Sequence, residues 1–189
     1  EDFYRETRDR GAFSPDAESS GRRALGNVAL TLLTARGTAA DIERLSDHFF
    51  NARTMTEEAH ALALIAARSG ALRDEAVARF HDRWKDDHLV IDTWFAAQAQ
   101  SPLRAALGQV KALTRHPLFS LTTPNKVRAL IGAFALQNPV QFHRPDGAGY
   151  DFLAGQVLEI DGFNPSIAAR LLGAFRAWTT LESGRRAAA

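Results

Sequence analysis

The sequence contains no cysteine and only one methionine among its 189 residues. Without cysteine the chain has no disulfide, no thiolate ligand for zinc and no thiol nucleophile. An excess of charge is also missing, because 23 basic and 22 acidic residues leave a formal net charge of +1. We therefore expect neither nucleic acid nor an anionic membrane as a partner.

Long apolar runs are missing as well. No stretch approaches the roughly 18 apolar residues of a membrane span, and the opening residues "EDFYRE" do not resemble a signal peptide. We expect a protein of the cytoplasm. The absence of a starting methionine and the ending "SGRRAAA" indicate a piece of a larger polypeptide.

The sequence also lacks the short motifs of common enzymes. It has no HExxH for zinc, no GxSxG for a serine nucleophile, and no GxxxxGK[ST] or strand-associated GxGxxG for nucleotides. Of the six histidines, His81 and His88 lie nearest to acidic residues, but Asp86 and Asp87 more simply cap a helix. We predict no catalytic residue and no metal site in this chain.

What the sequence does contain is helical periodicity. Apolar residues recur at helical spacing almost throughout, and no segment alternates as a strand would. One such stripe consists of Ala24, Leu25, Val28, Leu32 and Leu33, and the next consists of Ile42, Leu45 and Phe49. An all-α fold follows.

Capping signals divide this helical sequence into short pieces. Thr38 with Asp41, and Thr54 with Glu57, have the spacing of capping boxes. Together with Ser69-Gly70 and Asp86-Asp87, these signals place helix starts near residues 38, 55, 71, 87 and 102. Five prolines follow a capping side chain and are predicted to open helices: Ser14-Pro15, Ser101-Pro102, Thr123-Pro124, Asn138-Pro139 and Asn164-Pro165.

Short helices with short links pack antiparallel to their neighbours, and a regular series of such hairpins stacks into a superhelical α-solenoid of the HEAT or armadillo kind. A compact bundle is the alternative. We expect one helical-repeat domain over residues 1–189, with regular hairpins in 1–115 and irregular helices in 116–189. The residues alone indicate a scaffold or interaction module without its own active site.

One segment differs from the rest. Residues 123–153, "TPNKVRALIGAFALQNPVQFHRPDGAGYDFL", concentrate prolines, glycines and aromatic residues. Phe134, Phe142 and Phe152 could form a stacking platform, but at helical spacing they more often form core. We interpret them as the core that locks short helices together.

This segment and its flanks also carry a family resemblance. "HPLFSLTTPNKVRALIGAFALQNPVQFHRPDGAGYDFL", followed by "IDGFNPSIAARLLGAF", resembles the C-terminal domain of bacterial aminopeptidase N, an M1 zinc metallopeptidase. Upstream, "FSPDAESSGRRALGNVAL", "NARTMTEEAHALALIA" and "RWKDDHLVIDTWFAAQA" extend the resemblance over nearly the whole chain.

The resemblance implies that this chain has a capping role and does not itself catalyse a reaction. The family's zinc and HExxH motif belong to a separate catalytic domain of the same polypeptide, so this chain alone is expected to be inactive and to hold no cofactor. The family's C-terminal domain caps that catalytic domain and limits access of peptides to the cavity over the zinc. The alternative is an independent helical-repeat adaptor that binds a protein or peptide.

The resemblance also implies substrate-binding residues. Two arginines that face the substrate cavity in the family match Arg128, in "NKVRAL", and Arg170, in "NPSIAARL". Ser166 matches a residue that forms part of the wall of the pocket for the first peptide side chain. A guanidinium suits a peptide carboxylate or carbonyl. For each arginine, a salt bridge between helices is the structural alternative.

Overall fold

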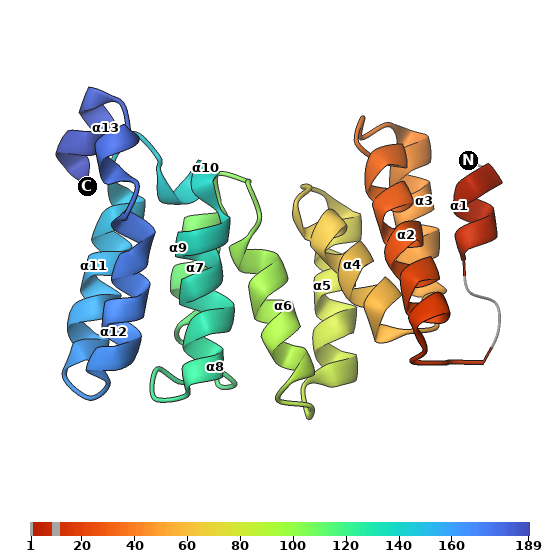
Figure 1. The fold of residues 1–189 in the computed structure, drawn as a ribbon, viewed down its shortest axis with the longest axis horizontal. Helices are drawn as coiled ribbons and strands as arrows, with labels where there is room; N and C mark the ends of the chain where they lie inside the picture. Colours follow the sequence, from red (N-terminus) through yellow and green to blue (C-terminus); the bar gives the residue numbers. More distant parts are fainter. Residues whose placement is uncertain (1, 9–11) are drawn as a thin grey trace. The chain divides into compact units, whose positions relative to one another are not determined.

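Every regular element in residues 2–8 and 12–189, the part that the computed structural model describes, is helical (Figure 1). The chain forms two compact units, and the division falls between Phe80 and His81. No helix in the described ranges combines the length and the apolarity needed to cross a bilayer.

From α2 to α5, the helices of the first unit are joined by short links, which favour antiparallel neighbours. α3 and α4 pack side by side, as do α2 and α4. The elements are α1 (Asp2–Thr7), α2 (Ala17–Leu33), α3 (Ala39–Phe50), α4 (Met55–Ala66) and α5 (Ala71–Trp84), the last of which continues past the division.

Both predicted capping boxes are present in this unit. The Thr38 amide donates to the Asp41 carboxylate at 2.9 Å, and the Asp41 amide donates to the Thr38 hydroxyl at 3.3 Å. Thr54 and Glu57 exchange the same two bonds at 3.2 and 3.3 Å. The helix starts at Ala39, Met55 and Ala71 are confirmed.

The expected start of α2 is wrong. The helix begins at Ala17 rather than at Pro15, because Asp16 is the residue that caps it and accepts from the Ser19 amide at 2.9 Å. The helix itself is confirmed, and its apolar stripe faces outward, because the apolar residues that α2 buries are Gly26, Ala29 and Leu30. Its exposed residues are Leu25 at 45%, Val28 at 56% and Leu32 at 72%.

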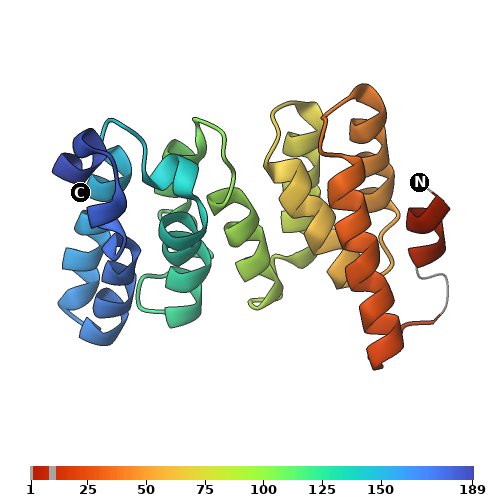
Figure 2. The same cartoon turned by 45° about the horizontal axis from the view of Figure 1, so that its top comes forward.

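The second unit is more irregular. α8, η1 and α9 follow one another without a break, and α11 and α12 lie side by side (Figure 1 and Figure 2). The elements after α5 are α6 (Val90–Ala99), α7 (Ala106–Leu113), α8 (Pro124–Val127), η1 (Arg128–Gly132), α9 (Ala133–Gln137), α10 (Pro139–Phe142), α11 (Ala148–Asp161), α12 (Pro165–Leu172), η2 (Gly173–Phe175), η3 (Trp178–Thr180) and α13 (Ser183–Ala188).

Three of the predicted proline starts are confirmed here, since Pro124, Pro139 and Pro165 each open a helix. The start at Pro102 is wrong, because α7 begins only at Ala106. The carbonyls of Ser101 and Pro102 are engaged elsewhere: they accept from the side chains of Asn138 and Gln141, each at 2.7 Å. These bonds hold the segment before α7 against α10.

The start predicted near residue 87 lies slightly later, at Val90. Asp87 nevertheless has the predicted capping role, because its carboxylate accepts from the amides of Leu89 and Val90 at 3.0 and 3.1 Å. Asp87 therefore caps the start of α6.

The aromatic residues of the irregular segment form core, as predicted. Phe134 meets Phe142 edge-on at 6.2 Å and Phe152 edge-on at 5.6 Å between ring centroids, and all three are buried. The turn at Gly147, whose φ of 71° is left-handed, leads into α11. Residues 123–153 are therefore largely architectural.

Candidate functional site

Arg128 stands at the start of a π-helical turn. The five residues of η1, Arg128–Gly132, interrupt the α-helical backbone between α8 and α9. Such turns are rare and occur frequently at functional sites, because the extra residue redirects side chains. The Arg128 guanidinium is exposed and donates through Nη2 to the side-chain oxygen of Asn125.

Arg170 lies near Arg128 but belongs to a different helix. It lies on α12, whose first turn is capped by Asn164 accepting from the Ile167 amide at 3.2 Å. Arg128 and Arg170 line one small pocket of about 60 Å³. The remaining lining is mostly apolar: Pro124, Val127, Gly132, Leu136, Ile167 and Leu171.

Neither arginine forms an ion pair with a carboxylate in the described part of the chain. The interhelical salt bridge that was the alternative interpretation is therefore not seen there. Ser166 is exposed at the start of α12 and is not among the residues that line this pocket. The structure thus brings the two arginines together and leaves Ser166 outside the lining.

A second pocket lies on the other side of Arg128, between α6 and the α8–η1–α9 segment. Its volume is about 310 Å³. The lining consists of Asp92, Ala96 and Gln100 on one wall and Asn125, Arg128, Ala129, Ala133 and Gln137 on the other. We call it the amide pocket, because three of its five polar side chains are carboxamides.

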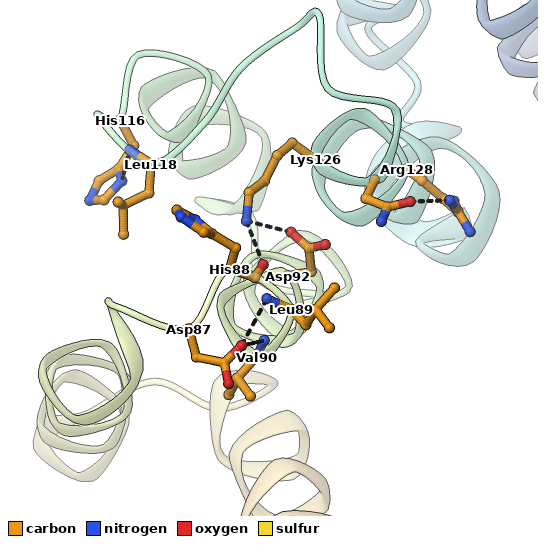
Figure 3. Close-up of polar contacts among 10 residues, drawn as sticks. Asp87, His88, Leu89, Val90, Asp92, His116, Leu118, Lys126 and Arg128 are labelled. Atoms are coloured by element: carbon orange, nitrogen blue, oxygen red, sulfur yellow. Dashed lines mark hydrogen bonds and ion pairs between the residues drawn. The ribbon is translucent and has the colours of Figure 1, made fainter.

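Next to the amide pocket, Lys126 links α8 to α6. Its Nζ donates to the Asp92 carboxylate at 2.7 Å and to the His88 carbonyl at 2.8 Å. The ammonium also lies 5.7 Å from the centroid of the Phe95 ring. Figure 3 shows Lys126 and Arg128 projecting in different directions, Lys126 towards α6 and Arg128 away from it.

Sequence reasoning missed Lys126 and Asp92. They lie 34 positions apart, and a single lysine or aspartate in a helical sequence carries no signal of a distant partner. Only the packing of α8 on α6 brings them together.

Three of the histidines lie apart from acidic clusters or in contact with aromatic rings. His81 and His116 both contact the Trp94 ring, with centroids 5.0 and 5.3 Å away, and burial lowers the pKa of His116, with nearby His81 lowering it further. His88 is exposed. Residues 2–8 and 12–189 contain no group of three or more histidine or acidic side chains placed to hold a metal ion.

The family comparison places this chain among helical-repeat domains. A family described as "Domain of unknown function (DUF3458_C) ARM repeats" matches residues 1–189. The chain belongs to this ARM-repeat family. The predicted all-α solenoid fold of armadillo type is thereby confirmed for this DUF3458_C domain.

The relatives of this DUF3458_C domain are aminopeptidases. It is 46% identical over 168 residues to aminopeptidase N of Caulobacter vibrioides, covering 89% of this chain and 20% of that protein. It is 37% identical over 155 residues to aminopeptidase N of Escherichia coli, covering 82% of this chain and 18% of that protein. The predicted relationship to aminopeptidase N is confirmed.

A solved structure gives the same result. The crystal structure of Legionella pneumophila aminopeptidase A in complex with aspartic acid matches with a TM-score of 0.86 and 31% identity. The match covers 99% of this chain and 23% of that one. This DUF3458_C domain therefore spans about a fifth of the length of the curated relatives it matches.

Proposed function

We propose that this chain is the C-terminal capping domain of a zinc-dependent aminopeptidase N, in which it shapes the access of peptides to a catalytic domain of the same polypeptide. The observation that carries the proposal is the pocket shared by Arg128 and Arg170, on a chain whose relatives are aminopeptidases N. Two guanidiniums without carboxylate partners in the described ranges are free to bind the carbonyls or the carboxylate of a peptide.

Arg128 and Arg170 are the residues we assign to peptide binding, with Ser166 beside the peptide's first side chain. Ser166 is exposed four positions before Arg170 on α12, so the two face neighbouring parts of one surface. Its hydroxyl is small, which leaves room for a peptide side chain next to it.

The zinc and the catalytic residues belong, in this proposal, to the catalytic domain. The sequence contains no HExxH, and without that motif the chain has no pair of imidazoles on one helical face with a general base between them. The chain by itself is therefore expected to be inactive. We place the whole polypeptide in the cytoplasm.

The exposed apolar stripe of α2 indicates a surface that packs against another part of the protein. Leu25, Val28 and Leu32 share one helical face and are exposed, and contiguous exposed apolar surface is typical of interfaces. The curated relatives are more than four times as long as this chain, so we assign this face to another part of the same polypeptide.

The test compares the chain with its parent polypeptide. Purified full-length protein is expected to bind zinc and to release N-terminal residues from peptides, whereas residues 1–189 alone are expected to do neither. Peptide hydrolysis by the purified chain above the buffer rate would overturn the proposal. An open reading frame that starts at residue 1, together with recovery of a protein partner in a pull-down, would instead favour an independent helical-repeat adaptor.

A further inference from the structure

Three arginines from different segments of the second unit line one pocket of about 550 Å³, a volume within the usual range for small-ligand sites. Arg104 precedes α7, Arg144 follows α10, and Arg185 belongs to α13. Asp146 is the one acidic residue that the described part of the chain contributes to the lining. The pocket therefore gathers positive charge in a protein whose total formal charge is only +1.

Two of these arginines are held in place by neighbouring groups. The Arg144 guanidinium donates through Nε and Nη2 to the two carboxylate oxygens of Asp146, each at 2.7 Å. Arg185 donates through Nε to the His143 carbonyl and through Nη1 to the Glu182 carboxylate at 3.3 Å. Because these contacts already orient both side chains, they have less rotamer freedom to lose when a ligand binds.

Donors are in excess in this pocket. A guanidinium carries more N–H groups than the contacts of Arg144 and Arg185 use, so both retain free donors within the described chain. Arg104 is exposed and has no hydrogen bond or ion pair with any described residue. The pocket thus offers several charged donors, which suits an anion that has several acceptor oxygens.

The remaining lining is largely apolar and indicates the kind of anion. Pro102, Val140 and Pro145 contribute to it, and Val140 is 58% exposed. A phosphate group that is attached to carbon presents three acceptor oxygens and nearly two negative charges, whereas a carboxylate has one charge and two oxygens. An organic group on the phosphate would cover the apolar residues.

We propose that this pocket binds a phosphate monoester of a small organic molecule. The guanidiniums of Arg104, Arg144 and Arg185 bind the phosphate, and the apolar lining contacts the organic group. Asp146 limits the affinity, because it occupies donors of Arg144 and places a negative charge beside the bound anion. The site shares no lining residue with the pocket of Arg128 and Arg170, and the inference does not depend on the proposed function.

The experiment measures binding of phenyl phosphate and of inorganic phosphate to the full polypeptide by calorimetry at constant ionic strength. A neutral chelator, phenanthroline, prevents any zinc from binding the phosphate. We expect phenyl phosphate to bind with a Kd of about 0.1 mM and inorganic phosphate to bind about fivefold more weakly. A Kd for phenyl phosphate above about 1 mM overturns the inference. Inorganic phosphate that binds as tightly as phenyl phosphate, or more tightly, overturns the assignment of an organic group.

Two substitutions in the pocket should change the affinity in opposite directions. Arg104→Gln removes a guanidinium that has no partner in the described chain, so it should leave the fold intact and weaken phenyl phosphate binding about tenfold. Asp146→Asn removes the negative charge and keeps an acceptor for the Ala148 amide, which Asp146 holds at 3.2 Å. This variant should bind phenyl phosphate about threefold more tightly than the wild type.

The matched control is Arg115→Gln, which removes the same charge from an exposed position just after α7 and outside the pocket lining. It should change the Kd by less than about twofold. Equal weakening by Arg104→Gln and Arg115→Gln overturns the inference, because attraction by net charge would then explain the binding. A folded Asp146→Asn variant that binds no more tightly than the wild type also overturns it. If Asp146→Asn does not fold, the comparison of Arg104→Gln with Arg115→Gln decides.

Discussion

Lys126 of α8 and Asp92 of α6 form an ion pair with a distance of 2.7 Å between Nζ and the carboxylate oxygen. The two residues lie 34 positions apart in the sequence. The lysine is almost fully buried and also donates to the His88 carbonyl at the approach to α6. This contact fixes α8 directly before the π-helical turn that begins at Arg128. It links the stability of the second unit to the position of its candidate binding residue.

Replacing Lys126 with methionine is expected to destabilise the protein by about 2 to 3 kcal/mol, because it leaves the partly buried Asp92 carboxylate without its cation. Urea denaturation followed by circular dichroism measures the loss. Lys111→Met, at an exposed position of α7, should change stability by less than about 0.5 kcal/mol. Equal losses in the two variants would contradict the assigned role of the ion pair.

His48 should make the first unit sensitive to acid. Its imidazole is 2% exposed and is hydrogen-bonded through Nδ1 to the Tyr4 hydroxyl. Burial, aided by the positive charge of Arg8, lowers the pKa of His48 from 6.5 to about 4. The unfolded chain therefore binds more protons than the folded chain between these values, so stability falls as the pH falls through this window.

The expected loss between pH 7 and pH 4 from this group is about 3 kcal/mol at most. Denaturation at a series of pH values compares the wild type with His48→Gln, which cannot titrate. The variant should show a shallower slope between pH 4 and 6.5. Parallel slopes would show that other groups cause the acid sensitivity.

Gly149 allows α11 to approach α10. A Cβ at this position would lie 2.3 Å from the Phe142 carbonyl oxygen, which is backbone and cannot move away easily. Gly149→Ala should cost about 3 kcal/mol. Gly155→Ala on the same helix, where a Cβ would meet nothing within 4 Å, should instead stabilise by up to about 1 kcal/mol. A tolerated Gly149→Ala would contradict the close approach.

Asn138 and Asn164 look equivalent in sequence but differ in the structure. Both cap a helix that begins with proline. Asn138 is also buried and donates to the carbonyls of Ala99 and Ser101 at 2.8 and 2.7 Å. Asn138→Ala should therefore cost about 3 kcal/mol and Asn164→Ala about 1 kcal/mol. Thermal unfolding of both variants checks the order, and equal losses would contradict it.

Local chemistry explains which parts of the fold could be predicted. A capping box involves residues three positions apart, so Thr38 with Asp41 could be identified without knowing the fold. Ser101-Pro102 also carries a local start signal, a capping residue before a proline, yet no helix starts there. Its carbonyls are held by Asn138 and Gln141, which lie more than 35 positions later.

The same limit applies to the candidate site. Arg128 and Arg170 were identified by resemblance, whereas their shared pocket depends on how η1 and α12 pack. Lys126 had no signal in the sequence. The exposure of the α2 stripe could not be predicted for a related reason, since helical periodicity reveals an apolar face but not whether that face is covered within the chain.

The central claim of the proposed function is that this domain binds the peptide substrate, and Arg170 is the residue through which that claim is tested most directly. The direct test is kcat/KM of the full-length polypeptide and its Arg170→Ala variant for a tripeptide and for an aminoacyl 4-nitroanilide, which lacks a second residue. We predict a loss of about tenfold for the tripeptide and a change of less than about twofold for the anilide. An equal loss for both substrates would contradict this role and leave Arg170 with a purely structural one.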